Sequence, residues 1–470
     1  MATPIPDNEA RFTGEEIVAA TGAEGALDGE VRGVYLDSRR ATVGCLFVAL
    51  RGETHDAHDY VAQAVDNGAT AVLVDRPVDV DAAVLVVDDT RRALGALAAM
   101  HRQRFSPTVI GVTGSVGKTT TKELIGAGLR GLGLTPLVTR GNLNNRVGVP
   151  MTLLTLDASH DAAVIEMGMN EPGEIADLAA MVAPTIGIVT AVAEVHTEGV
   201  GGIEGVAREK SALLEALDAT GVAVFNADDA PLVRRIDALR AETRIGFGRA
   251  EAADLRLVDH AIDENGTNAR FSWRGAELEA RMSLLGIHAA LDAAGALAVI
   301  AGLDERRLGD AAGALSSVEP PPHRMAPLRI GPLLVIDDVY NASPRSVKAA
   351  LETCGELARA RGGALIAVLG DMLELGHREE VLHEEVGRAA IDAGAKAVIA
   401  CGERMTHAGR AALKATMESG GPTAKVVLLR DVGSAAECIR EVAGPRDVVL
   451  VKGSRGMQME RVITALEGEE

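Results

Sequence analysis

The fold of this chain is decided by one stretch, which reads Val109-Ile110-Gly111-Val112-Thr113-Gly114-Ser115-Val116-Gly117-Lys118-Thr119-Thr120. Apolar residues lead into the glycines and a helical pattern runs on from Lys122, so the stretch predicts a strand, a glycine loop and a helix. Backbone N–H groups of such a loop close around phosphate oxygens, the Lys118 ammonium can pair with a β- or γ-phosphate, and the Thr119 hydroxyl can bind Mg²⁺. The spacing departs from the strict phosphate-loop pattern, because Val112 stands where that pattern has its first glycine. The stretch nevertheless favours nucleotide phosphate binding over an incidental glycine-rich turn.

Composition limits the class of protein. A chain of 470 residues favours three domains of roughly 100–200 residues each. Hydrophobic residues make up 47% of it and aromatic residues only 2%, so the cores are expected to be aliphatic. The formal net charge of -20 argues against a nucleic-acid or anionic-membrane ligand.

The sequence also predicts where the protein works. We find neither a signal-peptide core nor an apolar window of about 18–20 residues, which is the length that spans a bilayer. The four cysteines are far apart and lack metal-ligand spacing. We therefore expect a cytoplasmic protein with reduced thiols and no membrane insertion.

Alternating strand and helix patterns predict an α/β protein with three domains. Residues 1–106 form a small α/β unit, and residues 107–318 form a central domain with a mostly parallel sheet covered on both faces. Residues 319–470 form a Rossmann-like, doubly wound domain. The segment 244–284 is expected to form short antiparallel strands at one edge of the central sheet, and Glu319-Pro320-Pro321-Pro322 is a stiff linker.

Two polar residues follow apolar strands of the central domain. Glu166 ends the strand predicted at 162–167, on the edge where the carboxyl ends of parallel strands meet the phosphate loop. Its carboxylate is placed to hold a nucleotide-bound Mg²⁺, and the alternative is a solvated turn residue. His196 follows the next strand and is either a ligand to a second metal ion or a structural histidine.

Three further regions carry polar side chains. Gly141-Asn142-Leu143-Asn144-Asn145 is either a turn cluster or a loop that orients a polar substrate. Lys210 lies in a predicted helix beside Glu209, which taken alone indicates a surface ion pair. Polar residues also follow three strands of the last domain, and their positions at one sheet edge suggest a working face.

With these motifs together, the chain resembles the ATP-dependent Mur ligases of peptidoglycan synthesis. Within that family it is similar to the branch that adds D-alanyl-D-alanine to UDP-N-acetylmuramoyl-tripeptide. The stretches that carry the resemblance are, in chain order, Asp37-Ser38-Arg39, 44–52, Asp56-Ala57-His58-Asp59, 141–145, 148–152, Asp338-x-Tyr340-Asn341-Ala342-x-Pro344, 369–376 and Val451-Lys452-Gly453-Ser454-Arg455-Gly456. They span nearly the whole chain in the family's order.

The resemblance implies a three-domain ligase that works through an acyl phosphate. The first domain would hold the UDP-sugar, the middle domain ATP, and the last D-Ala-D-Ala. The catalytic and metal-binding positions would be Lys118, Thr119, Glu166, His196 and Arg324, with Lys210 as a carbamylated ligand to a second magnesium ion. The ATP contacts would be residues 113–120, Asp292, Arg324 and Asp338. The substrate contacts would be Ser38, Arg39, Asn142, Asn144, Asn145, Asn341, Lys452, Ser454 and Arg455. The partners implied are UDP-MurNAc-tripeptide and D-Ala-D-Ala, with no nucleic acid, and we expect a monomer.

Two departures from the family pattern stand out. The family commonly has Gly-Arg-His-Asn-x-x-Asn at the helix that meets adenine, where this chain reads Gly286-Ile287-His288-Ala289-Ala290-Leu291-Asp292. A carboxylate at Asp292 accepts a hydrogen bond but cannot donate one, so looser base selectivity is expected. His323 stands before Arg324 where the family tends to have glycine. Two alternatives remain open, namely a related ligase that adds the third amino acid and a nucleotide-binding homologue without turnover.

Overall fold

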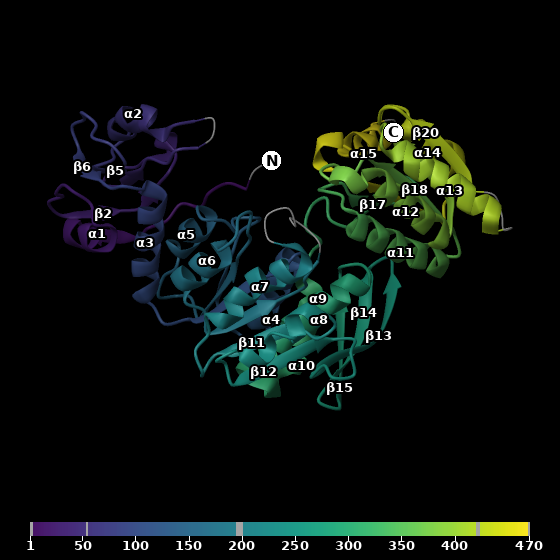
Figure 1. Cartoon of the computed structure of the whole chain (residues 1–470), viewed down its shortest axis with the longest axis horizontal. Coiled ribbons are helices and arrows are strands. Elements are labelled where there is room, and N and C mark those ends of the chain that lie inside the picture. Colours follow the sequence, from purple (N-terminus) through teal and green to yellow (C-terminus); the bar gives the residue numbers. More distant parts are fainter. Residues whose placement is uncertain (1–2, 53–54, 194–200, 420–423, 469–470) are drawn as a thin grey trace. The chain divides into compact units, whose positions relative to one another are not determined.

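The computed structural model describes residues 3–52, 55–193, 201–419 and 424–468 (Figure 1). Its backbone contacts divide the chain into two compact units. Unit 1 comprises residues 1–257, 271–278 and 292–314, and unit 2 comprises 258–270, 279–291 and 315–470. Each unit has its own hydrophobic core.

Unit 1 begins with a four-stranded parallel sheet in the order β3-β4-β5-β6. The elements of this region are β1 (Arg11–Thr13), α1 (Gly14–Thr21), β2 (Glu30–Arg32), β3 (Val34–Tyr35), β4 (Leu46–Val48), α2 (Val61–Asp66), β5 (Ala71–Val74), β6 (Ala83–Val86) and α3 (Thr90–Gln103). Thr13 and Glu16 form a capping box at the start of α1. Helix α3 packs against α1 and also against α5 and α6 of the next region, so it joins the two regions through one shared core.

The central sheet has nine strands in the order β15-β14-β13-β12-β11-β10-β7-β9-β8. The strands are β7 (Thr108–Thr113), β8 (Pro136–Val138), β9 (Ala162–Glu166), β10 (Ile186–Val189), β11 (Val222–Asn226), β12 (Thr243–Gly248), β13 (Leu255–Asp263), β14 (Gly266–Trp273) and β15 (Ala276–Met282). Strand β7 lies between β9 and β10 and is parallel to both. The phosphate loop therefore leaves the middle of the parallel part of the sheet.

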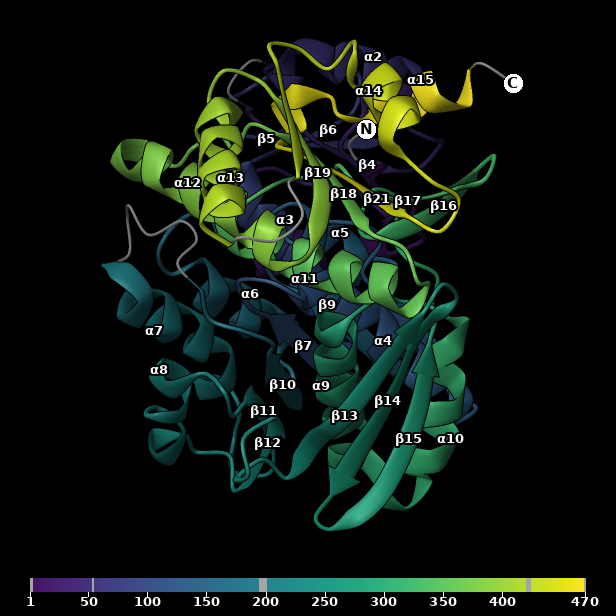
Figure 2. The same ribbon diagram turned by 90° about the vertical axis from the view of Figure 1, so that its right-hand side faces the viewer.

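The prediction of antiparallel strands from residue 244 onward is correct for only part of this edge of the sheet. Strand β12 is parallel to β11, and β13 is parallel to β12. Strands β13, β14 and β15 then follow one another through two-residue connections, which join antiparallel neighbours, and they are long rather than short (Figure 2). An alternating pattern indicates one buried face but not the direction of the neighbouring strand, which explains the error.

Helices cover the central sheet. They are α4 (Lys118–Gly131), α5 (Gly148–Leu153), α6 (Glu174–Val182), α7 (Gly202–Glu215), α8 (Ala230–Val233), α9 (Ile287–Asp304) and α10 (Leu308–Ala314). Helix α4 begins at Lys118, four residues before the helical pattern in the sequence becomes visible. Helix α8 is short, since it ends at Val233, and a 3-10 turn then carries Ile236 back into the core.

One helical stretch corrects the sequence-based view of membrane spans. Residues Ile287–Ser317 are long and apolar enough to cross a membrane by length and composition, with a mean hydropathy of 1.5 in the most apolar window. In the structure 61% of that window is buried. A Cβ added at Gly295 of α9 would come within 3.1 Å of Ile188 and Phe247, which shows how closely the helix packs on the sheet. These properties are those of a core helix.

Unit 2 contains a six-stranded sheet in the order β16-β17-β21-β18-β19-β20. Its elements are β16 (Ala326–Ile330), β17 (Leu333–Asp338), α11 (Pro344–Ala360), β18 (Leu365–Gly370), α12 (Glu379–Asp392), β19 (Ala395–Cys401), α13 (Met405–Ser419), β20 (Lys425–Leu429), α14 (Ala435–Val442), β21 (Val448–Lys452) and α15 (Glu460–Glu467). Apart from β16, which is antiparallel to β17, the strands are parallel, as expected for a doubly wound domain. Sequence reasoning missed β16 because it is a short edge strand containing Pro327.

Candidate active site

The phosphate loop has the geometry that its glycines predicted. Gly114 and Gly117 have φ angles of 152° and 83°, in a region that L side chains rarely adopt. A Cβ at Gly114 would lie 2.0 Å from Thr190 Oγ1, and one at Gly117 would lie 2.3 Å from Asp292 Oδ1. The loop therefore needs glycine at both positions, and it ends at the N-terminus of α4, where the helix dipole attracts anions.

The other loop residues hold it to the neighbouring strands. Thr113 Oγ1 donates to the carbonyl oxygen of Met167 at 2.8 Å, and the carbonyl oxygen of Val116 accepts from Thr190 Oγ1 at 2.5 Å. Ser115 Oγ accepts from the N–H of Ala193 at 3.0 Å. Thr120 lies in the first turn of α4. The loop is thus fixed before any ligand binds.

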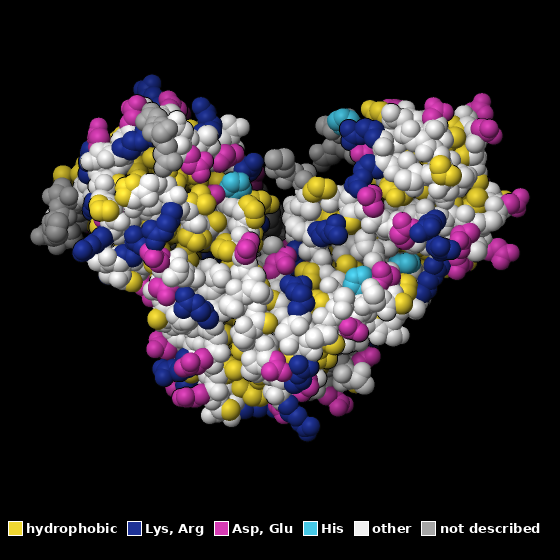
Figure 3. Space-filling model, turned by 180° about the vertical axis from the view of Figure 1, so that it is seen from behind, with side chains coloured by type: hydrophobic (Ala, Val, Ile, Leu, Met, Phe, Trp, Pro, Cys, Tyr) yellow, Lys and Arg dark blue, Asp and Glu magenta, His cyan; other side chains and the backbone are white. Residues whose placement is uncertain are grey.

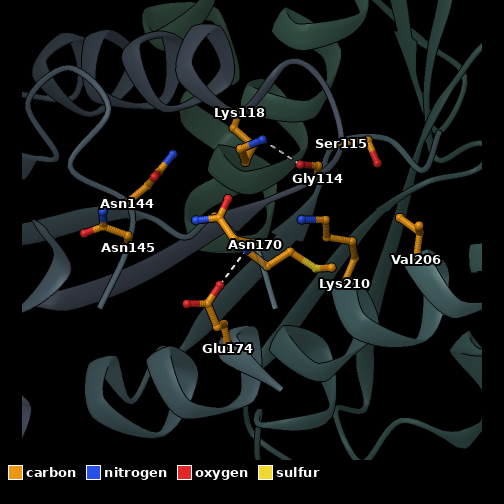
Figure 4. A pocket seen from close by; sticks show the side chains of 11 residues that line it. Gly114, Ser115, Lys118, Asn144, Asn145, Asn170, Glu174, Val206 and Lys210 are labelled. Carbon is orange, nitrogen blue, oxygen red and sulfur yellow. Dashed lines mark hydrogen bonds between the residues drawn. The ribbon is translucent and has the colours of Figure 1, made fainter. Parts of the chain in front are cut away.

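A pocket opens beside this loop, and two lysines extend into it (Figure 4). It is lined by Gly114, Ser115, Lys118, Asn144, Asn145, Gly168, Met169, Asn170, Glu174, Val206 and Lys210. Lys118 Nζ donates to the carbonyl oxygen of Gly114 at 2.7 Å. Lys210 is 4% exposed, so it is not the surface residue that its neighbour Glu209 suggested. Burial, together with the charge of Lys118, lowers the pKa of Lys210 to about 7.

Glu166 and Thr119 meet behind this pocket, as expected from their positions on one sheet edge. Thr119 Oγ1 lies 3.1 Å from Glu166 Oε2, and Asn144 Nδ2 donates to Glu166 Oε1 at 2.8 Å. The Glu166 side chain is only 1% exposed, so it is not a solvated turn residue. A carboxylate and a hydroxyl side by side are hard oxygen ligands that suit Mg²⁺. Among the residues that the structure describes, no group of three or more His, Cys, Asp or Glu side chains could hold a metal ion by itself. His196 lies outside the described residues.

The three asparagines of the loop at residues 141–145 have different hydrogen-bond partners. Asn144 contacts Glu166, whereas Asn145 Oδ1 accepts from the N–H groups of Val147 at 3.0 Å and Gly148 at 2.8 Å, at the start of α5. Asn142 Oδ1 accepts from Thr3 Oγ1 at 2.7 Å. Of these three asparagines, Asn144 and Asn145 line the pocket and Asn142 does not.

Asp292 contacts the phosphate loop from helix α9. Its Oδ1 accepts from Thr121 Oγ1 at 3.3 Å and packs against Gly117. Desolvation at this place raises the pKa of the Asp292 carboxyl to about 8. The expectation of an acceptor-only carboxylate therefore holds only above that pH, because the neutral acid also carries an O–H donor.

The two residues expected to contact a UDP-sugar lie after β3. Ser38 is buried, and its Oγ donates to Gln63 Oε1 at 2.6 Å. Arg39 is exposed and pairs with Asp37, with 2.7 Å between Arg39 Nη2 and Asp37 Oδ2. The hydrogen bond from Arg39 lowers the pKa of Asp37. Both residues follow the carboxyl end of a parallel strand, but only Arg39 is exposed there.

In unit 2 the candidate residues gather at the ends of β17 and β21. Lys452 Nζ lies 2.6 Å from Asp338 Oδ2 and donates to the carbonyl oxygen of Asn341 at 2.9 Å. Burial raises the pKa of Asp338, and the charge of Lys452 opposes that rise. Ser454 Oγ accepts from the N–H of Leu373 at 2.9 Å, and Arg455 pairs with Glu460 at 3.3 Å.

Arg324 stands on a constrained backbone in the same unit. Its guanidinium carbon lies 4.1 Å from the centre of the Tyr340 ring. The residues on either side, His323 and Met325, have φ angles of 64° and 51°, which non-glycine residues seldom adopt. His323 Nδ1 lies 2.8 Å from Asp337 Oδ2, which holds the unusual backbone in place.

Sequence reasoning missed two contributors to the pocket region. Glu174 lines the pocket, and its Oε2 accepts from the N–H groups of Asn170 at 2.5 Å and Glu171 at 3.1 Å. Lys122 is fully buried behind Glu166. The sequence offered a weak signal for Glu174, which begins α6 after a glycine, and none for Lys122.

The surface carries mixed charge. On the face in Figure 3, Lys and Arg side chains are interspersed with Asp and Glu side chains and do not gather into one basic field.

Comparison with known proteins identifies the family to which the chain is similar. Three family models match it in order, namely the Mur ligase family catalytic domain at residues 30–102, the Mur ligase middle domain at 112–300 and the Mur ligase glutamate ligase domain at 323–455. The UDP-N-acetylmuramoyl-tripeptide–D-alanyl-D-alanine ligase of Escherichia coli K12 is 37% identical over 454 residues, which cover 94% of this chain and 96% of that protein.

Solved structures agree with the sequence comparison. A crystal structure of MurF from Acinetobacter baumannii has a TM-score of 0.87 and 30% identity, covering 99% of this chain and 100% of that one. MurF of Thermotoga maritima in complex with ADP has a TM-score of 0.81 and 28% identity, covering 93% and 97%. The chain therefore belongs to the Mur ligase family.

Proposed function

We propose that this chain is the ATP-dependent ligase that adds D-Ala-D-Ala to UDP-N-acetylmuramoyl-tripeptide. The products would be the UDP-linked pentapeptide, ADP and phosphate. One observation carries the proposal: a phosphate loop whose pocket holds two lysines, Lys118 and Lys210, in a chain 37% identical over nearly its whole length to a ligase of that name. No feature of the described residues favours addition of the third amino acid or a protein without turnover.

The charges of the pocket suit the reaction. The terminal carboxylate of the tripeptide attacks the γ-phosphorus of ATP, and ADP leaves, so two negatively charged groups have to approach each other. The Lys118 ammonium and the N–H groups of the loop neutralise part of that charge. The amine of D-Ala-D-Ala then attacks the acyl phosphate, loses a proton, and the tetrahedral intermediate expels phosphate.

Magnesium is proposed as the metal, with Thr119, Glu166 and His196 as the residues that would hold it. When bound, it would withdraw negative charge from the phosphate oxygens. Lys210 is proposed to react with CO₂ to form a carbamate, with loss of one proton. Its lowered pKa supports this, because the neutral amine is the reactive form and is present near pH 7. The carbamate would reverse the charge at this position and supply two further oxygen ligands.

The remaining subsites are assigned as follows. We propose that residues 113–120, Asp292, Arg324 and Asp338 bind ATP. We propose that the peptide and sugar substrates contact Ser38, Arg39, Asn142, Asn144, Asn145, Asn341, Lys452, Ser454 and Arg455. The pairs that Lys452 and Arg455 form with Asp338 and Glu460 would have to rearrange or be shared when a ligand binds.

The organisation of the chain completes the proposal. We place the domain boundaries at 1–106, 107–318 and 319–470, and we propose a cytoplasmic monomer that does not insert into the membrane. The burial of the apolar helix α9 supports the last point.

The proposal is tested by phosphate release from ATP with the purified protein, UDP-MurNAc-tripeptide and D-Ala-D-Ala. Each component is omitted in turn, and the product is weighed by mass spectrometry. We expect turnover only with the complete mixture and a mass gain of one dipeptide less water. Turnover with a single amino acid on the dipeptide-linked precursor would indicate the related ligase, and ATP binding without turnover on any acceptor would indicate a non-catalytic homologue.

A further inference from the structure

Lys122 is a lysine without exposed surface, one turn after Lys118 on helix α4. Its side chain is 0% exposed, although lysine is almost never fully buried unless it is paired. In the sequence it precedes Glu123 on a helix and looks like an ordinary surface residue.

The ammonium group of Lys122 joins three parts of the central domain. It donates hydrogen bonds to the carbonyl oxygens of Thr139 and Gly141, the latter at 2.7 Å. It also lies 3.6 Å from Glu166 Oε2 and 3.5 Å from Glu123 Oε1. Lys122 thus ties helix α4 to the segment after β8 and to the end of β9.

One of the groups that Lys122 contacts, the carboxylate of Glu166, belongs to the candidate metal position. The carboxylate of Glu166 contacts Thr119 and Asn144 on one side and Lys122 on the other. Asn144 belongs to the loop that begins at Gly141, and its carbonyl oxygen accepts from the N–H of Gly168 at 2.8 Å. Displacing Gly141 would therefore move Asn144, and with it one of the two neutral groups that orient Glu166.

We propose that Lys122 is a positioning residue for the nucleotide–metal site. It fixes the Thr139–Gly141 backbone and the Glu166 carboxylate relative to helix α4, so that Glu166 and Asn144 are in place before Mg²⁺ and nucleotide arrive. Lys122 does not line the pocket and is not expected to touch the nucleotide. The inference rests on the proposed use of magnesium at Glu166.

If the role of position 122 were only structural, an apolar residue would fill it at a smaller cost in free energy. Burying a cation costs free energy, and well-packed hydrophobic replacements of buried ion pairs are often neutral or stabilising. We therefore explain the buried lysine by the groups that its N–H donors and its charge hold in place, which are the Thr139–Gly141 backbone and the Glu166 carboxylate. Methionine has a similar length without those donors, which makes Lys122→Met the informative substitution.

The test compares Lys122→Met with Leu129→Ala, a buried control two turns further along α4. Calorimetry measures ADP affinity with and without Mg²⁺, and hydrogen exchange of the ligand-free protein reports on residues 139–145. For Lys122→Met we expect metal-free ADP affinity within about 2-fold of wild type, a loss of at least about 10-fold in the tightening by Mg²⁺, and faster exchange confined to 139–145. Leu129→Ala should keep the Mg²⁺ effect and should exchange faster along α4.

Three outcomes overturn the proposal. In the first, Mg²⁺ tightens ADP binding to Lys122→Met as much as to wild type. In the second, Lys122→Met loses the same ADP affinity with Mg²⁺ as without it. In the third, the ADP affinity of the wild-type protein does not depend on Mg²⁺. If Lys122→Met fails to fold, Lys122→Gln is used, which retains a donor but no charge, with the same expectations. Phosphate release by the wild type tests the proposed function separately, since the calorimetry needs neither the peptide nor the dipeptide.

Discussion

The pocket of unit 1 and the residues at the ends of β17 and β21 in unit 2 differ in how their positive charges are arranged. In unit 1, Lys118 and Lys210 extend into one space, and the charge of Lys118 lowers the pKa of Lys210. In unit 2, Lys452 is paired with Asp338 at 2.6 Å, and Arg455 is paired with Glu460. In the first arrangement two ammonium groups repel each other, which an anionic ligand would relieve, whereas in the second each cation lies against a carboxylate.

This difference separates lysines whose removal should leave the fold intact from lysines whose removal should weaken it. Like charges brought together in a pocket are costly without a ligand, so their removal should not harm the folded protein. A buried pair behaves in the reverse way, because removing one partner leaves the other charge unpaired. Lys118→Met and Lys452→Met test that division, and Lys210→Arg and Asp292→Asn test two further groups of the pocket region.

Lys118→Met should have the largest effect. Loss of the ammonium group from the phosphate loop is expected to lower the turnover number about 10³-fold, while the melting temperature stays within about 1 °C of wild type. Phosphate release and thermal denaturation measure the two quantities. Lys414→Met, on the exposed face of α13, is the control, and a large loss of stability in Lys118→Met would abolish the contrast with unit 2.

Lys452→Met should lower the stability of the folded protein, unlike Lys118→Met. Lys452 and Asp338 have side chains 3% and 11% exposed, so the substitution leaves a buried carboxylate without its partner and should cost about 3 kcal/mol in the free energy of unfolding. Urea denaturation measures it, with the half-exposed Lys348→Met as control. Adding Asp338→Asn should recover part of the loss. No recovery would mean that the pair is not the source of the effect.

Lys210→Arg separates charge from carbamate formation. Arginine keeps the cation but cannot take up CO₂, so turnover is expected to fall about 10²-fold, with partial rescue of Lys210→Ala by a small carboxylic acid. Because the pKa of Lys210 is about 7, carbamate content should rise as the pH passes from 6 to 8. Carbon-13 NMR with labelled CO₂ detects it, and full activity of Lys210→Arg would refute the carbamate.

Asp292→Asn should have the smallest effect, and it depends on pH. The carboxyl has a pKa near 8 when folded and near 4 when unfolded, so the folded chain binds the additional proton between these values. Stability from this group is complete below pH 4 and is lost as the pH rises toward 8. The amide introduced by the substitution cannot ionise, so the variant should exceed wild type by at least about 1 kcal/mol at pH 8 and by little at pH 5. Urea denaturation at the two pH values measures this, and an equal difference at both would contradict the raised pKa.

Much of this arrangement could be predicted from the sequence. The glycines of the loop, the strand that ends at Glu166 and the rule that parallel strands share one functional edge together brought Thr119 and Glu166 into contact. What the sequence could not supply was burial. Lys122 and Lys210 each stand beside a glutamate in a helical pattern, which is typical of surface residues, and only the tertiary packing places both in the interior.

Strand direction was the second limit. The segment from 244 to 284 shows alternation, but alternation is the same for parallel and antiparallel neighbours, so β12 and β13 could not be assigned. The raised pKa of Asp292 was equally hidden, because it arises from burial against residues such as Gly117 that lie far away in the sequence, and the hydrogen bond from Thr121 opposes it.

The most direct measurement of the proposed chemistry uses UDP-MurNAc-tripeptide labelled with oxygen-18 in its terminal carboxylate. If that carboxylate attacks ATP in the pocket of Lys118 and Lys210, one labelled oxygen leaves with the phosphate when the dipeptide amine displaces it. We expect one oxygen-18 atom in each released phosphate, together with a pentapeptide product that retains the other. Unlabelled phosphate would mean that water, not the peptide carboxylate, attacks the nucleotide, and would contradict the assignment of this pocket to peptide-bond formation.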